Sequence, residues 1–195
     1  MRGGHPPSSL LWLVGTLTGL GILLAVASVF LQGGGSSSGI SPLALPVFSL
    51  QGQRAPQFKA PLLAGDGKTV TPRQFLGKPL LINFWASWCP PCNQEETTLV
   101  KAARQYAGRV QFLGVNVTDK DSVEAAQRFD AVYKVGWPTA RDMSGSISSM
   151  YRVLAIPTTF FVNPDGVVVA RVEGPLGADQ LAAELNRLIR PTGDG

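Results

Sequence analysis

The stretch Phe84–Glu96 reads FWASWCPPCNQEE and holds the only two cysteines of the 195-residue chain. Cys89 and Cys92 are separated by two prolines. Before them, Leu80–Trp85 is a continuous apolar run of strand length, which is typical of a strand covered on both faces. After them, apolar residues recur at helical spacing from Leu99 to Tyr106. The cysteine pair is therefore expected where a buried strand gives way to a helix.

This position predicts a redox pair. The spacing fits a disulfide that closes a small ring across the first helical turn. The free N–H groups and the positive dipole at the helix start favour a thiolate at Cys89, and the loop-to-helix junction should leave this residue reachable. Pro90 and Pro91 suit the first helical positions, where N–H groups have no intrahelical partner. We expect Cys89 to act as the nucleophile and Cys92 to resolve the mixed disulfide.

Two alternatives to redox chemistry remain open for the cysteine pair. Zinc needs four ligands, and the single histidine, His5, lies far from the cysteines near the amino terminus, so a metal would have to be shared between two chains. A purely structural disulfide over so short a loop would remove little chain entropy. Both alternatives are weaker than redox function, and the sequence predicts no cofactor beyond the cysteine pair itself.

The remaining pattern predicts an α/β domain built on a central mixed sheet with helices on both faces. The first half alternates strands and helices, as a parallel sheet requires, and the second half adds an antiparallel hairpin and a last helix. Before residues 80–106 we expect short strands at 59–63 and 69–70 and a helical turn at 72–75. After them we expect a strand at 110–117, a helix at 122–133, strands at 158–162 and 167–172, and a helix at 178–189.

Particular residues support these elements. Ser122 is a plausible N-cap, and Ala125, Phe129 and Val132 should lie on the inner side of its helix. The turn residues Asn163–Gly166 should join the last two strands. Leu181, Leu185 and Leu188 should face inward from the last helix. The segment Trp137-Pro138-Thr139 is expected to be a packed loop.

The amino-terminal region predicts attachment to a membrane. Leu10–Leu31 contains no charge, and a helix of this length spans roughly the 30 Å hydrocarbon layer of a bilayer. Arg2 precedes it and no basic residue follows before Arg54, so the positive-inside rule places the head in the cytoplasm and the rest outside. A cleaved signal peptide is the alternative, with Ala25–Ala27 resembling a cleavage site.

The resulting domain organisation has five parts. Residues 1–9 form a cytoplasmic head, 10–31 a transmembrane anchor or signal, 32–45 a flexible linker rich in glycine and serine, 46–190 the globular domain and 191–195 a tail. The formal charge of +4 is spread without a basic run or a stripe of interleaved aromatic residues. Binding to nucleic acid is therefore not expected.

The stretch Trp85–Cys92 resembles the active site of the thioredoxin superfamily, and its exported branch of TlpA/ResA/CcmG (DsbE)-like thiol–disulfide oxidoreductases in particular. The resemblance covers about Arg54–Arg190. It includes Ala55–Phe58, Gly65–Lys68, Gly77–Pro79, Ile156–Phe160 and Asp165-Gly166. It implies a thioredoxin fold.

The resemblance also implies roles for residues around the cysteines. Ile156-Pro157 would be a cis peptide beside the disulfide, where the backbone pairs with an extended client, although an ordinary trans proline is the alternative. Trp88, Pro90 and Pro91 would belong to the client-binding surface, although Trp88 could equally serve packing.

Two positions are acidic in members of the superfamily. Cytoplasmic thioredoxins carry a buried carboxylate six residues before the first cysteine, where this chain has Asn83. The exported branch often has a glutamate three residues after the second cysteine, and Glu95 holds that place. A helix puts Cys92 and Glu95 on one face, so Glu95 could relay protons to the resolving thiol. The alternative is a solvated glutamate that is favoured by the helix dipole.

The expected function is that of a membrane-tethered thiol–disulfide reductase with its catalytic domain in the periplasm or on the outer face. The resemblance implies client proteins with cysteine pairs, apocytochrome c in cytochrome c biogenesis first among them, and a membrane dithiol electron donor of the CcdA/DsbD kind. The anchor would also contact membrane lipid. A general exported reductase, an oxidase and a non-catalytic haem or metal chaperone are the alternatives.

Overall fold

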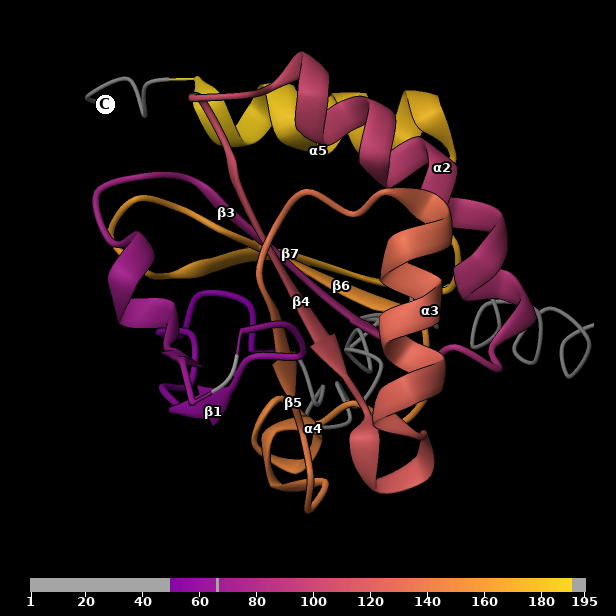
Figure 1. Cartoon of the computed structure of the whole chain (residues 1–195). Coiled ribbons are helices and arrows are strands. Elements are labelled where there is room, and N and C mark those ends of the chain that lie inside the picture. The colour runs from indigo at the N-terminus through magenta and orange to yellow at the C-terminus, as the bar shows by residue number, and fades with distance from the viewer. Residues whose placement is uncertain (1–49, 66, 191–195) are drawn as a thin grey trace, which may run out of the picture. The chain divides into compact units, whose positions relative to one another are not determined.

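The computed structural model describes residues 50–65 and 67–190, and these residues form a five-stranded sheet with helices on both faces (Figure 1). The predicted head, membrane segment, linker and tail lie outside the described residues. Within the described residues, no helix has the length and apolar character needed to cross a bilayer. The elements are β1 (Ala60–Pro61), β2 (Thr69–Val70), η1 (Pro72–Phe75), β3 (Leu80–Trp85), α2 (Pro90–Gln105), β4 (Gln111–Asn116), η2 (Thr118–Lys120), α3 (Val123–Tyr133), β5 (Thr139–Arg141), α4 (Ser146–Met150), β6 (Thr158–Val162), β7 (Val168–Glu173) and α5 (Ala178–Ile189).

The sheet has the strand order β5-β4-β3-β6-β7. The central strand β3 runs parallel to β4, and β4 runs parallel to β5. On the other side, β3 pairs antiparallel with β6, which forms an antiparallel hairpin with β7. This is the expected mixed sheet. All six residues of β3 are buried, as its continuous apolar run predicted.

The two faces of the sheet carry different helices. Leu81 of β3 packs with α2 and α5, and Trp85 packs with α3, where its ring stacks on Phe129 at a centroid distance of 4.3 Å. The alternate residues of β3, such as Phe84, point to the opposite face and pack against Tyr151, which ends α4. In Figure 1, α2, α3 and α5 accordingly lie on one side of the sheet, and α4 and the β1–β2 pair lie on the other.

Most predicted elements are present close to their expected bounds, but the prediction of which residues of α3 face inward was wrong in part. Ser122 caps α3 by accepting a hydrogen bond from the Ala125 N–H at 3.1 Å, as predicted. Val132, which was expected to face inward, is 73% exposed. The inner face of α3 is made by Ala126 and Phe129, because the helix is rotated so that Phe129 meets Trp85.

Three short elements, η2, β5 and α4, were missed by the sequence analysis. Thr139–Arg141 forms the edge strand β5 where a packed loop was expected, although Trp137 does pack, with its ring centroid 5.4 Å from that of Phe112. The helix α4 begins after Asp142, whose carboxylate accepts hydrogen bonds from the N–H groups of Ile147 (3.1 Å) and Ser148 (2.8 Å). Three and five residues are too few for periodicity to reveal.

Candidate active site

The cysteine pair lies where β3 ends and α2 begins. Cys89 is the N-cap of α2, and its Sγ accepts a hydrogen bond from the Cys92 N–H at 3.2 Å. The two residues form a disulfide with Cα atoms 5.3 Å apart. Pro90 and Pro91 occupy the first helical positions, as expected. A thiolate at Cys89 would thus face the unpaired N–H groups and the positive end of the helix dipole.

The expectation that Cys89 would be reachable is wrong for the oxidised protein. Cys89 is 2% exposed and Cys92 is fully buried. Both lie in an apolar cluster with Leu63 and Trp85, against which Ile156 packs from the loop before β6. These side chains shield the disulfide, so a partner sulfur must be brought to it by a segment that binds the surrounding surface.

That surface includes Trp88, which is 56% exposed. Its indole Nε1–H donates a hydrogen bond to the Lys120 carbonyl at 2.7 Å, so the ring is held at the surface and does not pack in the core. Pro90 is exposed and Pro91 half-buried. These three residues therefore reach the surface beside the disulfide, and their role in client binding stays a prediction.

A second segment, directly before β6, reaches the disulfide. The Ile156-Pro157 bond is cis. The Ile156 carbonyl oxygen lies 3.7 Å from the Sγ of Cys89. In the disulfide this sulfur carries no proton, whereas a thiol at Cys89 could donate to the same oxygen. Pro157 is buried and Ile156 is half-buried.

Glu95 is buried behind the disulfide, and the alternative of a solvated glutamate is wrong. The residue is 2% exposed. Its Oε1 accepts a hydrogen bond from Asn83 Nδ2 at 2.9 Å, and its Oε2 accepts one from the Leu176 N–H at 2.8 Å. Burial raises the pKa of Glu95 to about 7, although both hydrogen bonds act in the opposite direction. Near neutral pH this carboxyl group can therefore accept or donate a proton.

Glu96 is a second buried carboxyl group, and the sequence analysis did not single it out. It is also 2% exposed. Burial, and then repulsion from Asp130 of α3 and from Glu95, raise its pKa to about 8. Burial likewise raises the pKa of Asp130 to about 6, although a hydrogen bond from Thr139 acts in the opposite direction. Glu96 follows Cys92 by four residues, one helical turn.

The loop that carries the cysteines is anchored by Asp121. Its carboxylate accepts hydrogen bonds from the N–H and the hydroxyl of Ser87, both at 2.7 Å, and from Asn116 Nδ2 at 2.9 Å. Although burial acts in the opposite direction, these hydrogen bonds lower the pKa of Asp121. The negative charge therefore fixes the backbone just before Trp88 and Cys89.

Comparison with known proteins identifies the family of this fold and site. A model described as the AhpC/TSA family matches residues 51–171. The thiol:disulfide interchange protein DsbE of Allochromatium vinosum is 30% identical over 170 residues, which cover 87% of this chain and 90% of the relative. The thiol-disulfide oxidoreductase ResA of Bacillus subtilis is 32% identical over 142 residues, which cover 72% and 76% of the two chains. Among solved structures, dsbF of Mycobacterium tuberculosis matches with a TM-score of 0.62 and 34% identity, over 68% of this chain and 95% of that one.

The chain belongs to the AhpC/TSA family. It is a thiol–disulfide oxidoreductase of the DsbE and ResA type, with a thioredoxin-like fold. Its redox-active group is the Cys89–Cys92 pair. In residues 50–65 and 67–190 no group of three or more histidine, cysteine, aspartate or glutamate side chains is placed to hold a metal ion.

The structure brings the predicted site residues of this oxidoreductase together around one disulfide. Trp88, Pro90 and Pro91 adjoin it in sequence, Ile156 reaches it from the loop before β6, and Glu95 lies one turn behind it. Sequence reasoning missed Glu96 and Asp121. Helical spacing from Cys92 could have indicated Glu96, whereas nothing local in the sequence indicates that Asp121 reaches back across 34 residues to Ser87.

Proposed function

We propose that the oxidoreductase is a membrane-tethered reductase that removes disulfides from exported client proteins, with apocytochrome c in cytochrome c biogenesis as the leading client. The observation that carries this proposal is the disulfide at the start of α2, buried between a client-accessible surface and a titratable carboxyl group. The names of its relatives, thiol:disulfide interchange protein and thiol-disulfide oxidoreductase, support the reaction class. The client follows from the resemblance to the TlpA/ResA/CcmG group.

The first half of the reaction takes place at Cys89. In the reduced protein its thiolate attacks one sulfur of the client disulfide. The client S–S bond breaks, a Cys89–client mixed disulfide forms, and the second client sulfur leaves as a thiolate that takes a proton from water. Trp88, Pro90, Pro91, Ile156 and Pro157 form the surface on which the client lies during this step.

The second half takes place at Cys92. Its thiol passes a proton to the ionised carboxylate of Glu95, and the resulting thiolate attacks the Sγ of Cys89. The mixed disulfide breaks, the client leaves with both cysteines reduced, and two electrons have passed from the protein to the client. The Cys89–Cys92 disulfide that remains is reduced again by a membrane dithiol, since soluble glutathione does not maintain a reducing poise outside the cytoplasm.

The location in this proposal rests on the sequence. Residues 10–31 would anchor the chain in membrane lipid, residues 1–9 would remain in the cytoplasm, and the linker 32–45 would join the anchor to the catalytic domain outside. Cleavage near Ala27 would release the same domain into the same compartment.

Trapping of mixed disulfides tests the proposal. In Cys92→Ser the mixed disulfide cannot be resolved, so Cys89 should retain its clients as adducts that disappear on addition of a reductant. Cys89→Ser is the matched control and should retain none. Adducts with c-type cytochromes or their maturation factors are the expected result. A broad set of exported proteins would instead indicate a general reductase, and the absence of adducts would contradict the enzymatic role.

A further inference from the structure

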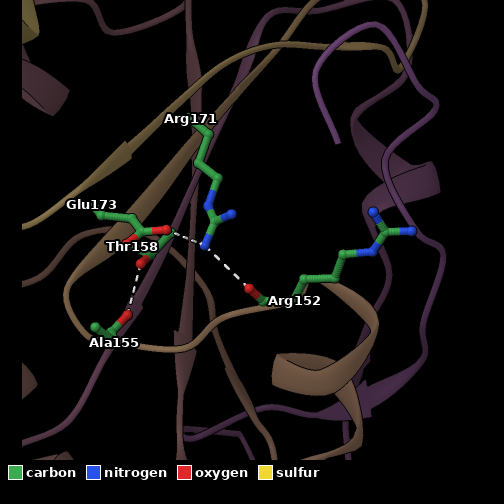
Figure 2. A network of polar contacts seen from close by, with 5 residues as sticks. All are labelled: Arg152, Ala155, Thr158, Arg171 and Glu173. Atoms are coloured by element: carbon green, nitrogen blue, oxygen red, sulfur yellow. Dashed lines mark hydrogen bonds and ion pairs between the residues drawn. The ribbon is translucent and has the colours of Figure 1, made fainter. Parts of the chain in front are cut away.

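The loop between α4 and β6 is tied to the sheet by a half-buried arginine (Figure 2). Arg171 of β7 has a side chain that is 10% exposed and forms an ion pair with Glu173. Its Nη2 donates a hydrogen bond to the carbonyl oxygen of Arg152 at 3.1 Å. Figure 2 shows the side chain of Arg152 pointing away from Arg171, so only the backbone of Arg152 is held.

The loop is tied a second time just before the cis peptide. The hydroxyl of Thr158 donates a hydrogen bond to the Ala155 carbonyl at 2.7 Å. The guanidinium carbon of Arg171 also lies 5.6 Å from the ring centroid of Phe160, which is fully buried. The backbone from Arg152 to Ala155 is thus fixed at both ends to strands of the sheet.

This fixed backbone presents an unusual side chain to solvent. Leu154 is 79% exposed, the highest value among the large hydrophobic residues of the described chain. A single exposed leucine is ordinary in itself. Leu154, however, is two residues from Ile156, whose carbonyl lies 3.7 Å from the Cys89 Sγ, and two residues span at most about 7 Å. An exposed apolar side chain therefore lies on the same tied loop whose Ile156 carbonyl reaches the reactive sulfur.

The neighbouring backbone offers a place for a polypeptide. In the described part of the chain, the carbonyl of Ile156 receives no hydrogen bond from a backbone N–H group. An extended client segment can donate to it while presenting its cysteine to Cys89. A client residue next to that cysteine then falls within reach of Leu154. Because the loop is already ordered, this contact costs little conformational entropy.

We propose that Leu154 is a specificity-determining contact, which selects clients with an apolar residue beside the reacting cysteine, and that Arg171 is the positioning residue that holds it in place. This inference rests on the proposed function, since it requires a polypeptide client at Cys89. The contact would give clients with an apolar neighbour about a tenfold advantage, at the low end of what one apolar contact supplies.

Two synthetic peptides test the inference. Both are closed by a disulfide between two cysteines, and they differ only in having leucine or serine at the positions that flank the cysteine pair. The reduced full-length chain should reduce the leucine peptide about ten times faster than the serine peptide. In Leu154→Ser this ratio should fall to about one, and in Leu154→Met it should be retained, because methionine preserves the apolar surface.

Matched controls separate the loop from general effects on the protein. Arg171→Met should lower the ratio, whereas Arg187→Met, which removes another arginine from an ion pair with a glutamate, should not. Val132→Ser removes another highly exposed apolar residue, in α3, and should also retain the ratio. An unchanged ratio in Leu154→Ser or Arg171→Met overturns the inference and leaves the reductase proposal standing. A wild-type protein that reduces neither peptide contradicts both.

Discussion

The two cysteines of the disulfide are three residues apart at the start of α2 and have different neighbours along the chain. Cys89 lies just beneath the surface, beside the exposed indole of Trp88 and a backbone carbonyl. Cys92 is fully buried and has Glu95 and Glu96 within the next turn of α2. Along the chain, therefore, buried carboxyl groups follow Cys92, whereas Trp88 precedes Cys89 and the Ile156 carbonyl reaches its sulfur.

The difference shows how one short motif assigns two roles. The helix start gives Cys89 the N–H groups and the positive dipole that stabilise a thiolate without any general base. Cys92 has no contact with water, so its proton must pass to a protein group. The two cysteines are thereby committed to attack and to resolution by their positions in α2.

Glu95→Gln is expected to have the largest effect on this division of roles. The amide preserves the size of the side chain but cannot take a proton, so attack by Cys92 should slow by about 10²-fold. In the wild type this rate should rise with pH through about 7, where Glu95 ionises, and in the variant this rise should be absent. The rate at which the mixed disulfide decays, monitored by rapid quenching at pH values between 5 and 9, measures both effects. Glu124→Gln, an exposed position of α3, is the control, and an unchanged pH profile in Glu95→Gln would contradict the relay.

Substitution of the neighbouring Glu96 should change the free energy of unfolding more than the rate of disulfide exchange. Because the folded protein raises the pKa of Glu96 from its usual 4.5 to about 8, it binds a proton that the unfolded chain releases in this interval. The free energy of unfolding should therefore fall as pH rises between these values. Glu96→Gln should flatten this dependence and be more stable than the wild type by about 2 kcal/mol above pH 8.

Urea unfolding of Glu96→Gln and the wild type at a series of pH values provides this measurement. Glu124→Gln again serves as the exposed control, with a profile parallel to that of the wild type. If the free energy of unfolding changed with pH equally in Glu96→Gln and the wild type, Glu96 would be ionised in the folded protein at no cost in stability, which would contradict its raised pKa.

Asp121→Asn, which changes the loop before Cys89, should have the smallest effect of the three substitutions. The asparagine keeps the shape but loses the charge that accepts hydrogen bonds from Ser87, at a cost of about 1 kcal/mol in the free energy of unfolding. The folded protein lowers the pKa of Asp121, so the contribution of its carboxylate is present above its usual value of 3.8 and is lost as pH falls below it. Unfolding at pH 7 and pH 3 measures this difference. Asp119→Asn, an exposed neighbour, should match the wild type at both values, and equal stability of Asp121→Asn would contradict the anchoring role.

The elements that sequence reasoning located share a strong local signal. The apolar run of β3, the turn at Asn163–Gly166 and the three leucines of α5 each indicate an element without reference to distant residues. The disulfide across the first turn of α2 follows in the same way from two cysteines with a fixed spacing.

What the sequence did not reveal depends on contacts between distant residues. The buried carboxyl group of Glu95 accepts hydrogen bonds from Asn83 and from the N–H of Leu176, which is 81 residues away. Val132 was assigned to the wrong face of α3 because helical spacing gives the period of an apolar face but not which neighbour, here Trp85, the helix meets. The shielding of Cys89 likewise comes from the remote loop at Ile156.

Alkylation of the reduced protein with a limiting amount of iodoacetamide, followed by mass spectrometry of the peptides, tests most directly whether the two sulfurs have separate roles. Cys89, stabilised as a thiolate near the surface, should carry nearly all of the label at pH 7. Cys92 should remain unlabelled until the protein is unfolded. Labelling that is equal at the two cysteines, or that favours Cys92, would contradict the account.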